Sequence, residues 1–154
     1  MPRRGTAPGG PVVSDPGPLL ALRAGLIGRF AADAALAALL GGRVRLYDEP
    51  PRGTLPVYAL FGDAEITDDS VDGAERHRHS HAIVVIAQAG SVRTALDAAA
   101  RMAALLQDAA TPPVLPLAGC RLVTLRVRAV RAHRDARTGE ARASLTVEAV
   151  TETL

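Results

Sequence analysis

The chain has 154 residues, of which 48% are hydrophobic and 22% are charged, and its formal net charge at pH 7 is +2. This length and composition predict one globular domain with a buried core and exclude wholesale disorder, and the small positive charge does not require a nucleic-acid partner. The single cysteine, Cys120, cannot form an internal disulfide, and no apolar stretch free of charge is long enough for a membrane span. We therefore expect a soluble protein, with no membrane contact, that is assembled in a reducing compartment.

The first part of the chain is predicted to be a flexible arm followed by one long helix. Residues 1–18 contain five prolines and four glycines and lack the apolar segment of a secretory signal, so we expect an arm before a single domain at 19–154. Apolar residues at helical spacing predict a helix over 19–40, and Gly41 and Gly42 end it.

Two short strands and an acidic segment are expected next. Alternation of apolar and polar residues predicts a strand at 43–48, and a second strand at 57–62 follows a proline-rich loop. The segment 62–75 contains six acidic residues and no basic residue. We interpret it as an exposed excursion rather than as part of the core.

A long strand and a second helix are predicted in the middle of the chain. The strand covers 74–88, and its apolar half at 82–87 is typical of a central strand covered on both faces. An amphipathic helix follows at 90–109, with Ser91 placed to cap it. Three prolines exclude a helix or a central strand over 110–119. The apolar stripe of the helix consists of Leu96, Ala99, Ala103 and Leu106.

The last two strands, at 120–132 and 140–150, are predicted to form a hairpin across 133–139. Each has one apolar and one polar face, which is typical of an antiparallel sheet with helices on a single side. The predicted apolar faces consist of Val123, Leu125, Val127 and Ala129 in the first strand and of Ala143, Leu145, Val147 and Ala149 in the second. The sequence therefore predicts an α+β fold, a mainly antiparallel sheet with two helices packed on one face, in the order α-β-β-β-α-β-β.

Three histidines at alternate positions, His77, His79 and His81, precede the apolar half of the long strand. Their imidazoles would line one face at intervals of roughly 7 Å, and this could be the first half of a zinc site. The remaining histidine, His133, lies in the predicted hairpin loop, and no further ligand run follows. We favour a solvated strand half whose imidazoles bind no metal; a zinc enzyme stays open as the alternative.

The sequence contains no catalytic constellation that we can identify. There is no nucleophile elbow, no phosphate-binding loop and no dinucleotide fingerprint. Cys120, at the mouth of a strand, is expected to be a small buried thiol. The nearest approach to a calcium loop is DDSVDG at 68–73, which lacks the full ligand spacing. We therefore expect neither a catalytic residue nor a cofactor.

Charges of opposite sign are segregated along the chain, since the acidic segment is followed by an arginine-rich hairpin. Such patches suit head-to-tail contacts between copies, which build a ring if the rotation closes. A solvated hairpin with ordinary arginine content and a small nucleic-acid-binding module stay open as alternatives, although the scarcity of aromatic residues argues against a platform for single-stranded bases. The candidate interface residues are Asp63, Glu65, Asp68, Asp69, Asp72, Arg126, Arg128, Arg131, Arg134 and Arg137.

The collinear order of these segments resembles the tail-terminator (tail-completion) family of long-tailed phages and of phage-like gene transfer agents. The resemblance runs from LLALRAGLIGRF in the first helix, through RHSHAIVVIA in the histidine-bearing strand, to LTVEAVTE at the end. It covers about residues 18–152. The chain departs from the family pattern by using alanine in place of aromatic residues in the central strand and by its longer arm.

This resemblance implies a structural virion protein without an active site. It implies a tail terminator whose hexameric ring caps the tail tube, stops the addition of tube subunits and offers a joining surface to the head-side connector or stopper. The ring would lie at the head–tail junction after assembly in the bacterial cytoplasm, and DNA would pass through its lumen without specific binding. On this interpretation the segments 63–75 and 121–145 are candidates for ring or tube contacts, and the arm 1–18 for a contact with the connector or a neighbour.

Overall fold

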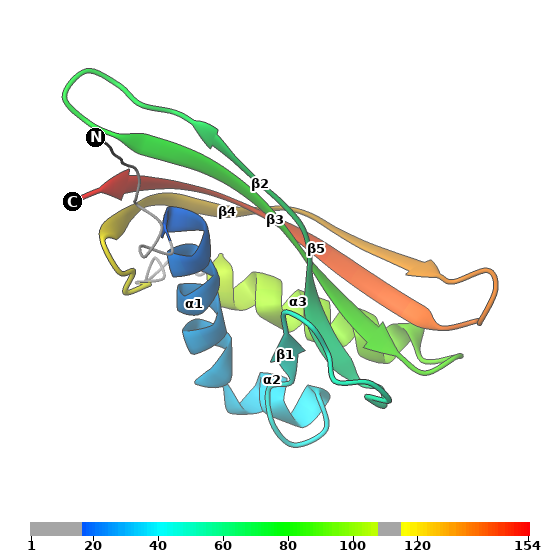
Figure 1. The fold of residues 1–154 in the computed structure, drawn as a ribbon. Coiled ribbons are helices and arrows are strands. Elements are labelled where there is room, and N and C mark those ends of the chain that lie inside the picture. The colour runs from blue at the N-terminus through cyan, green and yellow to red at the C-terminus, as the bar shows by residue number, and fades with distance from the viewer. Residues whose placement is uncertain (1–16, 108–114) are drawn as a thin grey trace, which may run out of the picture.

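The computed structural model describes residues 17–107 and 115–154 and contains three helices and five strands in them. In chain order these elements are α1 (Gly17–Ala31), α2 (Ala34–Leu39), β1 (Leu46–Tyr47), β2 (Tyr58–Asp68), β3 (Arg76–Ala87), α3 (Val92–Leu106), β4 (Cys120–Arg134) and β5 (Ala141–Thr153). The strands form one sheet in the order β1-β2-β3-β5-β4, in which only the β1–β2 pair is parallel. The helices cover one face of this sheet (Figure 1), which confirms the predicted α+β class.

The core lies between the helices and the sheet face that they cover, which we call the inner face. Because alternate residues of a strand point to the same side, the inner-facing side chains at 83–87 of β3 and at 141–149 of β5 form one continuous apolar layer. Burying one aliphatic side chain of this kind stabilises the fold by roughly 1.5–3 kcal/mol. The fully buried members of this cluster include Leu22, Leu26, Phe30, Ile83, Val85, Met102, Leu145 and Val147.

No helix of the described residues covers the opposite, outer face of the sheet (Figure 1). Ala82 and Val84 of β3 point to this face and are half-buried. Ile86 also points to this face and is buried, so the prediction that 82–87 is covered on both faces holds at Ile86 and fails at Ala82 and Val84. An antiparallel sheet with helices on one side needs only one dry face, so apolar residues on the other face do not imply a second layer.

The single helix predicted over 19–40 is broken at Asp33 into α1 and α2. The Asp33 backbone is extended, and its Oδ2 accepts a hydrogen bond from the backbone N–H of Leu36 at 2.8 Å, which makes it the N-cap of α2. Arg101 of α3 donates two hydrogen bonds to the same carboxylate, at 2.6 and 2.8 Å, and these hold the pKa of Asp33 down at about 2. The prediction failed because Asp33 is a cap and not a polar position within one helix.

The first half of the acidic segment, 62–68, is strand, so only its second half is an excursion, although most of the segment is exposed as predicted. β2 extends to Asp68 and pairs with β3 along its length, so only the turn between these strands leaves the sheet. Between Phe61 and Ala64, β2 has one residue more than β3, which is a β-bulge. Gly62 lies in this bulge, where an added Cβ would approach the Cβ of Ala82 to 3.3 Å.

β4 contains two irregularities in its pairing with β5, between Leu122 and Thr124 and between Val127 and Ala129. A bulge changes which side chains share a face. Val123, predicted to lie on the apolar face, is 37% exposed and lines a cavity on the outer face. The predicted apolar face of β5 is confirmed, because its four named residues are all buried.

The remaining boundaries also differ from the predicted ones. β1 has only two residues where a strand at 43–48 was expected, and α1 begins two residues inside the expected arm. Ser91 precedes α3, but its side chain makes no capping hydrogen bond. Residues 1–16 of the predicted arm and 110–114 of the proline-rich segment lie outside the described residues, whereas 115–119 form neither helix nor strand. Within 17–107 and 115–154, no helix combines the length and the apolar character that crossing a membrane requires.

Candidate interaction surfaces

The three histidines of β3 point to the inner face, under the helices. His79 and His81 are fully buried and His77 is half-buried, so the prediction of a solvated strand half is wrong. The signal was present in the sequence, because the histidines are in phase with Ile83 and Val85, whose side chains belong to the core. A solvated strand half was predicted because histidine is a polar residue, although the alternation with Ile83 and Val85 places the histidines on the core side.

The buried imidazoles pack as aromatic groups. His79 Nε2 shares a hydrogen bond of 2.9 Å with the Thr151 hydroxyl on β5. The rings of His79 and His81 stack with centroids 6.4 Å apart, and His81 meets the Phe61 ring edge-on at 6.0 Å. The guanidinium of Arg23, on α1, lies over the Phe61 ring, 4.7 Å from its centroid.

The surroundings favour neutral imidazoles. Burial lowers the pKa of both His79 and His81 from 6.5 to about 4, and neighbouring histidines add to the effect on His79 while Arg23 adds to that on His81. Across the described part of the chain, no three His, Cys, Asp or Glu side chains are grouped so that they could hold a metal ion. What this cluster offers chemically is aromatic packing with one hydrogen bond.

Cys120, the first residue of β4, is buried, which confirms the prediction for its thiol. It packs at the end of the sheet where β4 begins. Its position is that of a small core residue.

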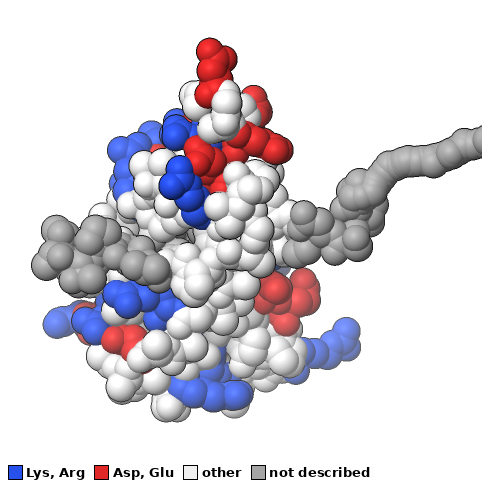
Figure 2. All heavy atoms as spheres, turned by 90° about the vertical axis from the view of Figure 1, so that its left-hand side faces the viewer, with Lys and Arg blue, Asp and Glu red and all other residues white. Residues whose placement is uncertain are grey.

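The acidic candidates separate into a strand edge and a turn. Asp63 and Glu65 are exposed on β2, beyond the part that pairs with β1, whereas Asp72 lies exposed in the turn between β2 and β3. Asp69 already pairs with Arg78, whose Nη2 lies 3.2 Å from Asp69 Oδ1. Figure 2 views this end of the molecule and shows acidic side chains gathered at its top with basic ones beside them.

The arginine candidates divide in the same way. Arg126 and Arg128 pair with Glu148 of the neighbouring strand. The tip of the β4–β5 hairpin lies at the opposite end of the sheet from the acidic turn (Figure 1), so the ten predicted residues do not form one site. Among the arginine candidates, three are exposed and make no ion pair to another described residue: Arg131, Arg134 and Arg137.

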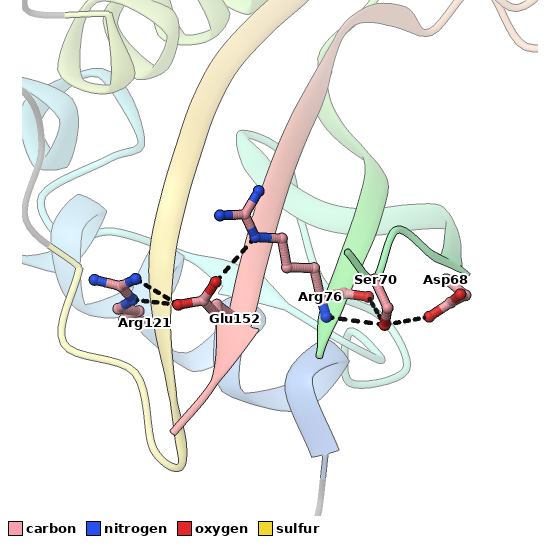
Figure 3. A network of polar contacts seen from close by, with 5 residues as sticks. All are labelled: Asp68, Ser70, Arg76, Arg121 and Glu152. Carbon is pink, nitrogen blue, oxygen red and sulfur yellow. Dashed lines mark hydrogen bonds and ion pairs between the residues drawn. The ribbon is translucent and has the colours of Figure 1, made fainter. Parts of the chain in front are cut away.

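A polar network joins the base of the β2–β3 hairpin to β5 and β4 (Figure 3). The Ser70 hydroxyl donates to Asp68 Oδ1 at 2.7 Å and accepts the backbone N–H of Arg76 at 3.1 Å. The Arg76 side chain donates to Glu152 Oε2 at 2.9 Å, and Glu152 Oε1 accepts from Arg121 Nε, also at 2.9 Å. Four strands thus end in one connected set of hydrogen bonds.

The same arrangement is repeated further along β5 at Glu148. Its Oε1 accepts from Arg126 at 2.7 and 3.0 Å, and its Oε2 accepts from Arg128 at 2.8 Å. These hydrogen bonds lower the pKa of Glu148, and those from Arg76 and Arg121 lower the pKa of Glu152. Both carboxylates are therefore ionised at neutral pH, each between two arginines.

Sequence reasoning missed Glu148 and Glu152 as partners of the arginines. The signal that could have found them is the antiparallel register, which places Arg126 directly opposite Glu148 and Arg121 opposite Glu152. The two bulges of β4 change that register, so counting back from the turn at 133–139 does not give these pairs.

Comparisons with known proteins agree with this architecture. A family model described as "Tail completion protein gp17" matches residues 24–152. A chain in the solved structure described as "Virion of native gene transfer agent (GTA) particle" is 32% identical, with a TM-score of 0.77, over 90% of this chain and 99% of that chain. No curated protein sequence matches significantly. The chain therefore belongs to the tail completion protein gp17 family, as its sequence predicted, and its role is a structural one in a phage-type tail.

Proposed function

We propose that the protein is a tail terminator, whose copies form a hexameric ring that caps the tail tube, ends its elongation and joins the tail to the head-side connector or stopper. Membership in the tail completion family and similarity to a chain of a gene transfer agent virion support this role. The ring assembles in the bacterial cytoplasm and lies at the head–tail junction, and DNA passes through its lumen without sequence-specific binding.

The observation that carries the proposal is that both edges of the sheet are open and differ in charge. Among the described residues, β1 pairs with β2 only as far as Leu60, so the rest of β2 is an open edge of the sheet. Within the same part of the chain, β4 pairs only with β5 and forms the opposite edge. Asp63 and Glu65 are exposed along the first edge, whereas Arg131 and Arg134, which make no ion pair to another described residue, are exposed along the second. Open edges invite pairing with another chain unless they are covered.

The directions of the two edge strands fit a head-to-tail contact. Three antiparallel pairings separate β2 from β4, so these strands run in opposite directions. Copies related by rotation about an axis along the strands would place β4 of one copy beside β2 of the next as an antiparallel pair, with basic against acidic residues. A closed ring of such contacts would cover both edges in every copy.

The two hairpins support separate contacts on the two faces of such a ring. The acidic turn between β2 and β3 and the tip between β4 and β5 project from opposite ends of the sheet (Figure 1). In a ring whose axis follows the strands, these ends belong to opposite faces. One face meets the tube and the other meets the connector.

Tube elongation in the presence of the protein tests this function. We expect tubes of the purified tail tube protein to stop lengthening once the protein is added, as measured by negative-stain electron microscopy. The variant Asp63→Arg/Glu65→Arg should lose this effect, whereas Glu49→Arg/Asp97→Arg changes the same number of charges outside β2 and should keep it. Tubes that continue to grow at the same rate with the unaltered protein would refute the proposal.

A further inference from the structure

The outer face of the sheet carries a charged network with arginines on both sides of a row of carboxylates. Within its ion pairs, five arginines meet three acidic side chains, an excess of two positive charges; the exposed Glu65, opposite Ser80 on the same face, makes no ion pair to another described residue. The glutamates lie on β5, and the arginines lie on β3 and β4, the strands on either side of it. The pairs are Arg76 and Arg121 with Glu152, Arg126 and Arg128 with Glu148, and Arg78 with Asp69.

The three arginines of β4 are the outermost groups of this network. The side chains of Glu148 and Glu152 are 19% and 13% exposed, whereas those of Arg121, Arg126 and Arg128 are 63–68% exposed. A guanidinium has five N–H donors, and Arg126 uses only its Nε and one Nη for Glu148. Each arginine therefore keeps donors for an acceptor that approaches from solvent.

A hollow of the outer face adjoins these arginines. A cavity of about 450 Å³ is lined by Arg76, Arg78 and Arg126, with Asp69 as its one acidic residue. Its other lining residues are Val123, Thr124 and Val150. Arginine forks around an open hollow fit phosphate oxygens, which accept two parallel hydrogen bonds.

We propose that this outer face contacts the phosphate backbone of duplex DNA, and that Glu148 and Glu152 keep the contact weak because they compete with phosphate for the same arginines. The basic rows on β3 and β4 are two strand spacings apart, roughly 10 Å, so the charge is spread over a surface and suits an extended polyanion. The inference rests on the proposed function for the presence of DNA beside the subunit, and it deepens that function by naming the surface.

A second copy of the chain is a poorer partner for this face. Two such faces would meet with their arginines outermost, and like charges in contact oppose association. DNA supplies regularly spaced anions without a fixed register, and such contacts are independent of sequence. A weak contact of this kind lets a duplex move along the surface.

Two double variants and a matched control test the proposal with a short fluorescently labelled DNA duplex and the full chain. Arg121→Gln/Arg126→Gln should weaken binding and lower the slope of log K against log salt by about 2 between roughly 50 and 200 mM NaCl. Glu148→Gln/Glu152→Gln should tighten binding several-fold, because the arginines lose their internal partners. The control Arg43→Gln/Arg93→Gln removes two exposed arginines outside this network and should have a smaller effect than Arg121→Gln/Arg126→Gln.

Fluorescence anisotropy reports the affinities, and circular dichroism checks that each variant is folded. Equal losses in the control and in Arg121→Gln/Arg126→Gln would overturn the proposal, as would unchanged or weaker DNA binding by Glu148→Gln/Glu152→Gln. A change in self-association without a change in DNA binding would assign the face to a second copy instead. Failure of the tube-elongation assay would refute the terminator role and leave these binding results unaffected.

Discussion

His81 is fully buried, yet neither of its ring nitrogens has a hydrogen-bond partner among the described residues. An unsatisfied buried polar atom costs about 1–3 kcal/mol relative to a bonded one. The Nδ1 atoms of His77 and His79 are also buried without a hydrogen-bond partner among the described residues. At the scale of residues, the histidine cluster therefore contains most of the buried polar side-chain atoms that lack a hydrogen bond in the described part of the chain.

Acid should destabilise the protein through His79 and His81. Their folded pKa of about 4 lies below the unfolded value of 6.5, so between these values the unfolded chain binds more protons. Their contribution to stability is complete above pH 6.5 and is lost as the pH falls toward 4. We expect each histidine to remove about 2 kcal/mol between pH 7.5 and 5.0, measured as the free energy of unfolding in urea.

His81→Leu should reduce this acid sensitivity by about half and should not lower stability at pH 7.5, because it removes two unsatisfied nitrogens. The matched control is His133→Leu, at an exposed position of β4, which should leave the pH dependence as it is. An unchanged pH dependence in His81→Leu would show that the histidine does not titrate as its burial requires.

At the scale of elements, the period of the sequence predicted the strands and helices well, but single residues decided where they end. Strand alternation identified both faces of β5, and helical spacing identified the buried side of α3. Asp33 broke the first helix because its carboxylate satisfies a backbone N–H and receives Arg101, a contact made across 68 positions of the chain. No local pattern contains such a partner.

Bulges accompany two further errors at this scale. One extra residue at Gly62 lets β2 continue through the acidic segment, and another at Val123 turns an apolar side chain to the outer face. Both are local shifts of register that composition does not reveal. The ion pairs of Glu148 and Glu152 depend on the same register, which is why the candidate site could be predicted only as segregated charge.

The β2–β3 hairpin should loosen when its serine is removed. In Ser70→Ala the backbone N–H of Arg76 loses the acceptor that it has at 3.1 Å. A neutral hydrogen bond contributes about 1 kcal/mol, so the amide of Arg76 should exchange with solvent about fivefold faster. Hydrogen exchange followed by NMR measures this rate.

Thr67→Ala is the control in the same hairpin, because the Thr67 side chain makes no hydrogen bond to a described residue. It should leave the exchange of Arg76 unaltered. Equal exchange rates in Ser70→Ala and in the unaltered protein would mean that the network in Figure 3 does not hold the turn.

At the scale of the whole molecule, the proposed ring predicts that two variants with reversed charge on one edge each will assemble only when they are mixed. Asp63→Arg/Glu65→Arg makes the β2 edge basic, and Arg131→Glu/Arg134→Glu makes the β4 edge acidic at exposed positions. Each variant alone should stay monomeric because like charges then face one another. Mixed in equal amounts, the two should assemble again, as measured by sedimentation velocity.

Glu49→Arg/Asp97→Arg controls for the change in net charge and should assemble like the unaltered protein. Assembly of either edge variant by itself, to the extent seen for the unaltered chain, would mean that these edges do not meet. Failure of the mixture to assemble when both variants are folded would count against pairing of acidic with basic edges.

The most direct test of the terminator role is the particle mass in solution, measured by light scattering with and without ends of the tail tube. We expect a ring of about six subunits of 16.0 kDa each, either free or formed on tube ends. A protein that remains at the mass of one subunit, and that does not bind tube ends, would contradict it.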